Sequence, residues 1–177
     1  MKKLLLHFLA AFSLMMAACN DASKSNESRG REPALSPSNT KQERNKKVIV
    51  ASIESLVTGN LDGTFKDAAT GFVDYGDGSS QPVTDIESLK GFLKVLLTSL
   101  EGYKAENLVY FADGDHVMVY GDWGGTFKAD MMGVKATGKM VKFKDVDIFK
   151  LNDEGKITEH RSVQNIGAVL MAAGPAK

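Results

Sequence analysis

Apolar residues follow three successive patterns along this chain: an almost unbroken run near the start, then helical spacing, then alternation with polar residues. The run covers Leu4–Ala18 and gives way to a long polar stretch. Apolar residues that recur every three or four positions then predict a helix over 45–58 and a short second helix over 61–69. The part of the chain that follows the polar stretch therefore begins with helices.

The clearest helical pattern begins at Thr84. Thr84 and Glu87 have the spacing of a capping box, in which each side chain accepts a hydrogen bond from the other residue's backbone N–H. Apolar residues then recur at helical spacing as far as Leu100, and Gly102 follows as a stop signal. The broad apolar face of this helix predicts that it packs against a sheet.

The remaining apolar runs have the composition of strands joined by turns. Asp113-Gly114 and residues 153–155 are typical of hairpin turns. Helices come first and consecutive hairpins come afterwards, which predicts an α+β fold with an antiparallel sheet. We expect the strands at 71–75, 104–112, 115–128, 141–151 and 156–165.

The first residues have the layout of an export signal. Lys2 and Lys3 precede the apolar run, whose length of about 15 residues falls short of the roughly 20 needed to span a bilayer. The run ends in Met16-Ala17-Ala18-Cys19, which resembles the lipobox of bacterial lipoproteins. The resemblance implies a signal peptide at 1–18, acylation of Cys19 and anchoring to the periplasmic or cell-surface side of a bacterial membrane.

Residues 19–44 are rich in Ser, Asn, Lys, Glu and Arg and contain few apolar residues. Such a segment cannot bury enough apolar surface to offset the entropy lost on ordering. We therefore expect a disordered tether over 19–44 and one folded domain over 45–174.

Charge and cysteine content narrow the range of functions. The chain has 22 Lys and Arg residues and 22 Asp and Glu residues, so no bulk attraction to nucleic acid is expected. Cys19 is the single cysteine and lies in the leader, which leaves the domain without a disulfide, a thiol nucleophile or a cysteine metal site. Residues 133–139 have the glycine spacing of a phosphate loop, but Met140 replaces the required Ser or Thr. We expect no cofactor and no metal.

Four segments carry a family resemblance: Gly121-Asp122-Trp123-Gly124-Gly125-Thr126-Phe127, Gly138-Lys139, Asp147-Ile148-Phe149-Lys150-Leu151 and Asp153-Glu154-Gly155-Lys156-Ile157-Thr158-Glu159-His160. They resemble the SnoaL-like group of the nuclear transport factor 2-like superfamily. The resemblance covers roughly residues 45–174. It implies a curved antiparallel sheet wrapped around two or three helices into a cone, with a pocket inside. Members include polyketide cyclases, isomerases, epoxide hydrolases and non-catalytic binding modules, so the resemblance favours the fold more than one activity.

The chain departs from the family pattern after Glu159-His160. Close family members often continue with Trp and Asp and end the strand with another Asp. Here these places hold Arg161, Ser162 and Asn165. Neither Ser nor Asn exchanges a proton readily near neutral pH, so these two positions do not supply a cyclase-type acid or base.

Side-chain alternation along 141–151 places Asp147 on one face together with Phe143 and Phe149. If this face lines the cone, partial burial raises the pKa of the Asp147 carboxyl. Asp147 then suits general-base chemistry or the anchoring of a polar ligand group. The alternative is a structural aspartate paired with a neighbouring side chain.

The register of the final hairpin decides which neighbour Asp147 meets. A three-residue loop over 153–155 sets Leu151 opposite Ile157 and Asp147 opposite Arg161, and this register is favoured because it pairs apolar with apolar residues. A loop of two or four residues would instead place Asp147 opposite His160. The first register predicts a fixed ion pair, and the second predicts a titrating dyad.

Further candidates for the pocket come from other elements. Trp123 and Phe127 share one strand face and could form an apolar floor, while Tyr75 lies near the end of the first predicted strand. Met132, with Met131 beside it, could close the pocket adaptably because thioether side chains are flexible. Core packing and loop packing are the alternatives for these residues.

Three functional hypotheses follow. The favoured one is a membrane-tethered domain that binds a small, mostly apolar molecule in the cone. The second is a cofactor-independent cyclase or isomerase in which Asp147 acts as general base and His160 or Arg161 stabilises an enolate. The third is an interaction module that forms a homodimer through the outer face of the sheet, as sheets of this fold commonly do.

Overall fold

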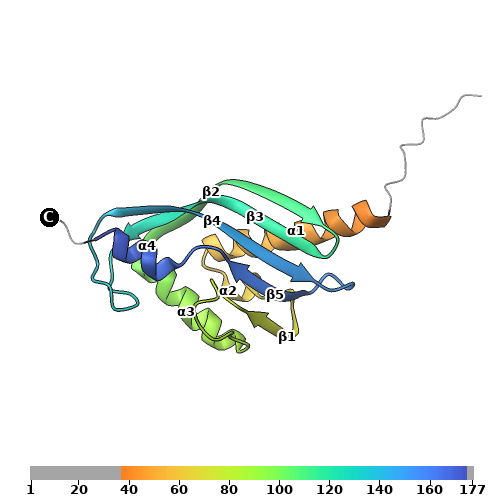
Figure 1. Cartoon of the computed structure of the whole chain (residues 1–177), viewed down its shortest axis with the longest axis horizontal. Coiled ribbons are helices and arrows are strands. Elements are labelled where there is room, and N and C mark those ends of the chain that lie inside the picture. Colours follow the sequence, from red (N-terminus) through yellow and green to blue (C-terminus); the bar gives the residue numbers. More distant parts are fainter. Residues whose placement is uncertain (1–36, 175–177) are drawn as a thin grey trace, which may run out of the picture. The chain divides into compact units, whose positions relative to one another are not determined.

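The framework of the domain is a five-stranded sheet with the strand order β1-β5-β4-β3-β2 (Figure 1). The structure is a computed structural model that describes residues 37–174. Strands β2 to β5 pair antiparallel, whereas β1 runs parallel to β5. The predicted α+β class is confirmed, with a parallel edge strand that the sequence pattern did not indicate. The elements in chain order are α1 (Pro37–Val57), α2 (Leu61–Thr64), β1 (Ala68–Asp74), α3 (Ile86–Ser99), β2 (Leu100–Asp113), β3 (His116–Phe127), β4 (Met140–Leu151), β5 (Ile157–Ser162) and α4 (Ile166–Ala172).

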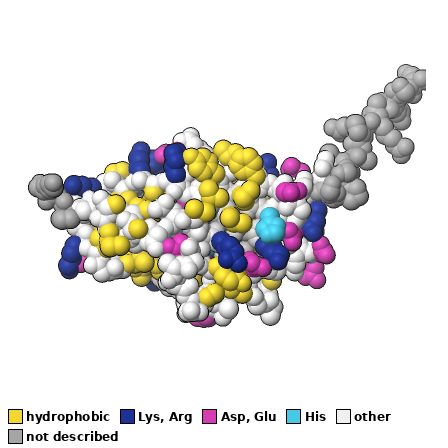
Figure 2. All heavy atoms as spheres, in the orientation of Figure 1, with side chains coloured by type: hydrophobic (Ala, Val, Ile, Leu, Met, Phe, Trp, Pro, Cys, Tyr) yellow, Lys and Arg dark blue, Asp and Glu magenta, His cyan; other side chains and the backbone are white. Residues whose placement is uncertain are grey.

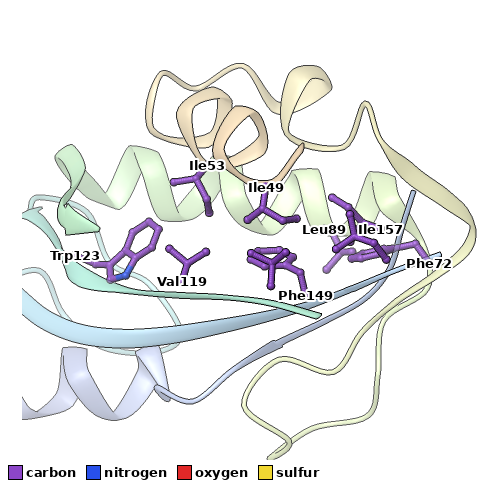
Figure 3. Packing of buried hydrophobic residues seen from close by; sticks show 10 residues of the cluster. Ile49, Ile53, Phe72, Leu89, Val119, Trp123, Phe149 and Ile157 are labelled. Carbon is purple, nitrogen blue, oxygen red and sulfur yellow. The ribbon is translucent and has the colours of Figure 1, made fainter. Parts of the chain in front are cut away.

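The main core lies between the helices and the inner face of the sheet (Figure 3). Ile49 and Ile53 of α1 point toward the sheet, where Val119 and Phe149 face them, and Leu89 of α3 joins the cluster. Full burial of each such side chain contributes about 1.5–3 kcal/mol. This packing fixes which face of the sheet is inside.

A second apolar cluster gathers residues from α3, β2, β3 and α4. Leu96, Leu100 and Phe127 are buried there with Leu170 of α4. Phe127 is directly opposite Leu100 in the β2–β3 register. The start of β2 is thereby tied to the end of β3.

Helix α1 begins at Pro37, well before the predicted start at residue 45, so part of the predicted tether is helical. Proline suits the first position of a helix because the backbone N–H that it lacks would have no partner there. The ammonium of Lys41 lies 2.7 Å from the Asp153 carboxylate, and Arg44 Nη1 donates to the Asp153 carbonyl oxygen at 2.8 Å. Hydrophobic periodicity missed this extension because polar side chains make its contacts with the distant β4–β5 loop.

The N-cap of α3 is Asp85, one residue after the predicted Thr84. The Asp85 carboxylate accepts hydrogen bonds from the Ser88 backbone N–H at 2.9 Å and from the Ser88 hydroxyl at 2.5 Å. Because Ser88 donates two hydrogen bonds to the charged Asp85 side chain, Asp85 is favoured as the N-cap over the Thr84 hydroxyl. The predicted helix exists, but the predicted capping box is wrong.

Two further elements differ from the prediction. Helix α2 ends at Thr64, because the chain turns there and enters β1 at Ala68. Helix α4 was not predicted, although Asn165 marks its start by accepting a hydrogen bond from the Ala168 N–H at 2.7 Å. The helix is only about two turns long, too short to show a clear periodicity.

Several large apolar side chains point outward from β2 and β3. Val109, Phe111, Met118 and Tyr120 are between 38% and 54% exposed. Phe111 is opposite Met118, and Val109 is opposite Tyr120, so the four form one continuous outer patch. Figure 2 shows hydrophobic side chains gathered over this part of the sheet.

Among residues 37–174, no helix combines the length and the apolar character that a membrane crossing requires. The predicted signal peptide, Cys19 and most of the predicted tether lie outside the described residues.

Candidate ligand pocket

A pocket of about 470 Å³ lies between the inner face of the sheet and the helices. All four helices and all five strands of the described residues contribute to its lining. The lining is mostly apolar, and its titratable groups include Asp147 and His160. The aromatic members are Phe65, Phe72, Tyr75, Phe92, Tyr103, Trp123, Phe143 and Phe149.

The last hairpin has a register that the sequence analysis did not consider. Leu151 is opposite Ile157, as predicted, and Gly155 has a left-handed φ of 80°. A bulge then leaves Thr158 without a partner on β4, so that Asp147 is opposite Ser162 and Phe149 is opposite His160. Because side chains alternate along a strand, this extra residue turns His160 to the inner face. Both predicted pairings of Asp147 are therefore wrong in register, although His160 still reaches it diagonally.

His160 is held between two carboxylates. Its Nε2 lies 3.2 Å from Asp147 Oδ1, and its Nδ1 lies 3.1 Å from Asp74 Oδ2. Asp74 ends β1 opposite His160 in the parallel pairing, and the Tyr75 N–H donates to the His160 carbonyl oxygen at 2.9 Å. The Phe149 ring lies against the imidazole with the ring centroids 4.8 Å apart. Backbone pairing thus positions every member of this Asp74–His160–Asp147 group.

The charges of this group are unequal. Burial alone would lower the pKa of His160, but hydrogen bonds and charges from Asp147 and Asp74 outweigh it and raise the pKa to about 10. Burial acts to raise the pKa of Asp74, yet His160 and the Gly76 N–H bring it below the usual value. Burial raises the pKa of Asp147, and its bond to His160 does not compensate. At neutral pH the imidazolium and the Asp74 carboxylate form an ion pair, and Asp147 is the one of the two carboxyls in this group whose pKa is raised.

Asp145 lies on the same strand face but has a structural environment. Its carboxylate accepts hydrogen bonds from the Ser162 hydroxyl at 2.7 Å and from the backbone N–H groups of Val146, Val163 and Gln164 at 2.6, 3.2 and 2.9 Å. These donors fix the chain after β5. Asp145 therefore contributes its charge to the pocket while its oxygens are already engaged.

Two stacked aromatic residues form part of the pocket wall. The rings of Tyr103 and Trp123 are 6.1 Å apart at an interplanar angle of 29°. Burial raises the pKa of the Tyr103 hydroxyl, and the charges of Asp147 and Asp145 add to this effect. Trp123 is 4% exposed, and its indole N–H has no acceptor among the described residues. The wall therefore carries polar donors as well as apolar surface.

Nine of the site residues that were predicted from the sequence fall within residues 37–174. Seven of these nine line the pocket, whereas Phe127 and Arg161 do not. Phe127 is fully buried in the second cluster, because β3 carries it past the pocket to its pairing with Leu100. The Arg161 guanidinium lies over the Tyr75 ring, 3.7 Å from its centroid, because the bulge turns Arg161 to the outer face. The seven that line the pocket are Tyr75, Trp123, Met132, Phe143, Asp147, Phe149 and His160.

Asp74 and Tyr103 are site residues that the sequence analysis missed. Asp74 immediately precedes Tyr75, but only the parallel pairing of β1 with β5 brings it to His160. Tyr103 lies one residue before the predicted start of its strand, so it was not assigned to a strand face. Within residues 37–174, no group of three or more potential metal ligands is arranged to hold an ion.

The raised pKa of His160 predicts a pH-dependent stability. A histidine pKa of about 10 in the folded state and 6.5 in the unfolded state stabilises the fold fully below pH 6.5, and this contribution is lost as the pH rises toward 10. We expect the free energy of unfolding to fall by at least about 1 kcal/mol across this window. Urea denaturation at several pH values measures it.

His160→Gln should remove most of this pH dependence, whereas His116→Gln, a change of an exposed histidine, should leave it intact. An equal loss of stability with pH in wild type and His160→Gln would contradict the ion-paired arrangement.

The family model for the SnoaL-like polyketide cyclase matches residues 47–172. A search of the curated proteins finds no match. Among solved structures, a candidate SnoaL-like polyketide cyclase from Jannaschia sp. CCS1 is 25% identical, with 82% of this chain and 100% of that chain covered and a TM-score of 0.66.

Two Streptomyces structures share the fold. AclR from Streptomyces galilaeus, described as a candidate hydroxylase, is 22% identical over 77% of this chain and 88% of its own, with a TM-score of 0.64. IdmH from Streptomyces antibioticus, described as a candidate polyketide cyclase, is 20% identical over 73% of this chain and 98% of its own, with a TM-score of 0.60. With a family model that spans most of the described domain, this chain belongs to the SnoaL-like polyketide cyclase family.

Proposed function

We propose that this domain binds a small, mostly apolar molecule that carries one polar group. The observation behind the proposal is the pocket of about 470 Å³, in which aromatic walls surround Asp147 and His160. Ligand pockets of this size are typically apolar with a few polar groups that fix orientation. The apolar part of the ligand would lie against Trp123 and Phe143, and its polar part against Asp147.

Filling the pocket should weaken ligand binding. Leu93 of α3 lines the pocket, whereas Val95 on the same helix is 49% exposed and does not line it. We expect the neutral dye N-phenyl-1-naphthylamine to bind the full chain saturably, and Leu93→Trp to weaken binding by at least about tenfold because the larger ring occupies the space. Dye fluorescence during titration measures the affinity.

Val95→Trp is the matched control and should bind as the wild type does. No saturable binding by the folded wild-type chain, or equal binding by both tryptophan variants, would contradict a ligand in this pocket.

A second candidate function is cofactor-independent catalysis of the cyclase or isomerase kind. The buried Asp147 carboxyl with its raised pKa favours it, because a base needs a pKa nearer neutral than that of a free aspartate. Several relatives are described as candidate polyketide cyclases, which supports the same chemistry. Asp147 would remove a proton beside a carbonyl group, and the His160 imidazolium and the Tyr103 hydroxyl would stabilise the enolate.

If this chemistry occurs, Asp147→Asn should lower turnover at least ~100-fold, because an amide cannot accept the proton. Asp122→Asn makes the same chemical change on the outer face of the sheet, where Asp122 pairs with Lys144 and Asn107, and should leave turnover unchanged. Steady-state rates on a cyclisable or isomerisable carbonyl compound measure it. Unchanged turnover in Asp147→Asn would remove Asp147 from the reaction.

We further propose that the chain is exported and anchored to a bacterial membrane by acylated Cys19. The basic start, the apolar run Leu4–Ala18 and the small residues before Cys19 support this. Cys19→Ser should move the protein from the membrane fraction to the soluble fraction and abolish labelling by a radioactive fatty acid. Labelling of the serine variant at the wild-type level would contradict acylation at Cys19.

We also propose a homodimer formed through the outer patch of Val109, Phe111, Met118 and Tyr120. Exposed apolar surface of this continuity is typical of an interface. Light scattering that gives a monomer mass would count against it.

A further inference from the structure

The pocket holds an excess of negative charge. Four aspartates line it, and His160 is the single basic side chain in the lining, which includes no Lys or Arg among the described residues. The four are Asp74, Asp77, Asp145 and Asp147. The chain as a whole has zero formal net charge, so the excess is a local property of this cavity.

We infer that the ligand of this pocket is an organic cation, an ammonium group on an apolar scaffold. The inference rests on the proposed binding function and specifies the chemical class of its ligand. An apolar cation matches both features of the lining, because carboxylates attract its charge and aromatic faces contact its body.

His160 offsets only part of the negative charge. Its imidazolium lies between Asp74 and Asp147 and carries one positive charge against two carboxyl groups. Asp145 is hydrogen-bonded by the neutral Ser162 hydroxyl and by backbone N–H groups. Asp77 accepts hydrogen bonds from Ser79 and from the Asn165 amide. Neutral donors orient a carboxylate without cancelling its charge, so the part-buried Asp145 adds negative charge to the pocket, and the more exposed Asp77, screened by water, adds less.

Asp147 is the carboxyl best placed to meet the cation. Its Oδ1 contacts His160, and no described residue donates a hydrogen bond to its Oδ2. The side chain is 13% exposed and lines the pocket, so Oδ2 is available to a ligand. A charge-assisted hydrogen bond from an ammonium in this partly desolvated place is stronger than one at the surface.

Aromatic rings complete the match. Trp123 is directly opposite Phe143 in the β3–β4 register, and Tyr103 stacks on Trp123, so three rings from three strands form one wall. Cations gain free energy over such faces, most over tryptophan. The Tyr75 ring is the exception, because the Arg161 guanidinium already lies over it.

The same charges disfavour an anionic ligand. A carboxylate or phosphate would meet like charges and would find no Lys or Arg in the described lining to pair with. Arg161, which follows His160 directly in the chain, could have paired with an anion, but its guanidinium contacts Tyr75 and it does not line the pocket.

Three probes of one shape test the inference. 1-Naphthylmethylamine is protonated at neutral pH, 1-naphthylmethanol is neutral and 1-naphthoate is anionic. In calorimetric titrations of the full chain, we expect the amine to bind at least about tenfold more tightly than the alcohol, and the carboxylate to bind most weakly. Asp147→Asn should bring the amine within about threefold of the alcohol, whereas Asp122→Asn should keep the wild-type preference.

The wild-type comparison does not depend on the folding of any variant. If the alcohol binds as tightly as the amine, or the carboxylate binds most tightly, the inference is overturned while the proposed binding function stands. If the dye and all three probes fail to bind the folded chain, both are overturned. Retention of the full amine preference in Asp147→Asn would overturn the assignment of Asp147 as the anchoring carboxylate.

Discussion

The candidate site depends on the bulge at Thr158, the one extra residue in β5. Without it, the pairing of Leu151 with Ile157 would continue down the hairpin and would turn Glu159 and Arg161 inward. With it, His160 joins the inner face, and Glu159 turns outward, where its carboxylate lies 3.2 Å from Lys150. The hydroxyl of Thr158 donates to the Lys150 carbonyl oxygen at 3.1 Å and so stabilises the bulge. The inner face of β5 consequently carries His160, next to Asp147 and Phe149 of β4, instead of Glu159 and Arg161.

The bulge brings His160 to the inner face, and β1 supplies the second carboxylate that keeps this histidine protonated. Burial disfavours the charged form of His160 and also that of Asp147, whose pKa it raises. With Asp147 as its single partner, the imidazole would be held in its protonated form less strongly. Asp74 supplies the additional charge, and its own position is fixed on both sides by backbone pairing, with β5 on one side and Val83 on the other. Parallel pairing of the edge strand is thus a requirement of the electrostatics of the pocket as well as of the fold.

Sequence reasoning predicted what local periodicity encodes and missed what long-range contacts encode. The burial of Leu89 and Leu96 on α3, the Gly114 turn and the inward row from Val141 to Leu151 follow from spacing alone, and they are confirmed. Phe92, which was predicted on the same face of α3, is instead 41% exposed. The start of α1 and the partners of Asp147 depend on contacts between residues about 110 and 13 positions apart. A single unpaired residue such as Thr158 leaves no periodic signal, yet it changes the face of every residue after it.

The departures from the family pattern acquire a physical meaning in this structure. Ser162 and Asn165 occupy places where the resembling family members often have aspartate. Here the Ser162 hydroxyl donates to Asp145, and the Asn165 amide donates to Asp77 while its oxygen caps α4. An aspartate at either place would put a second carboxylate against the first, and two adjacent carboxylates cannot both stay ionised without a large cost. Serine and asparagine at these two places therefore give the carboxylates of Asp145 and Asp77 a neutral hydrogen-bond donor where an aspartate would bring a like charge.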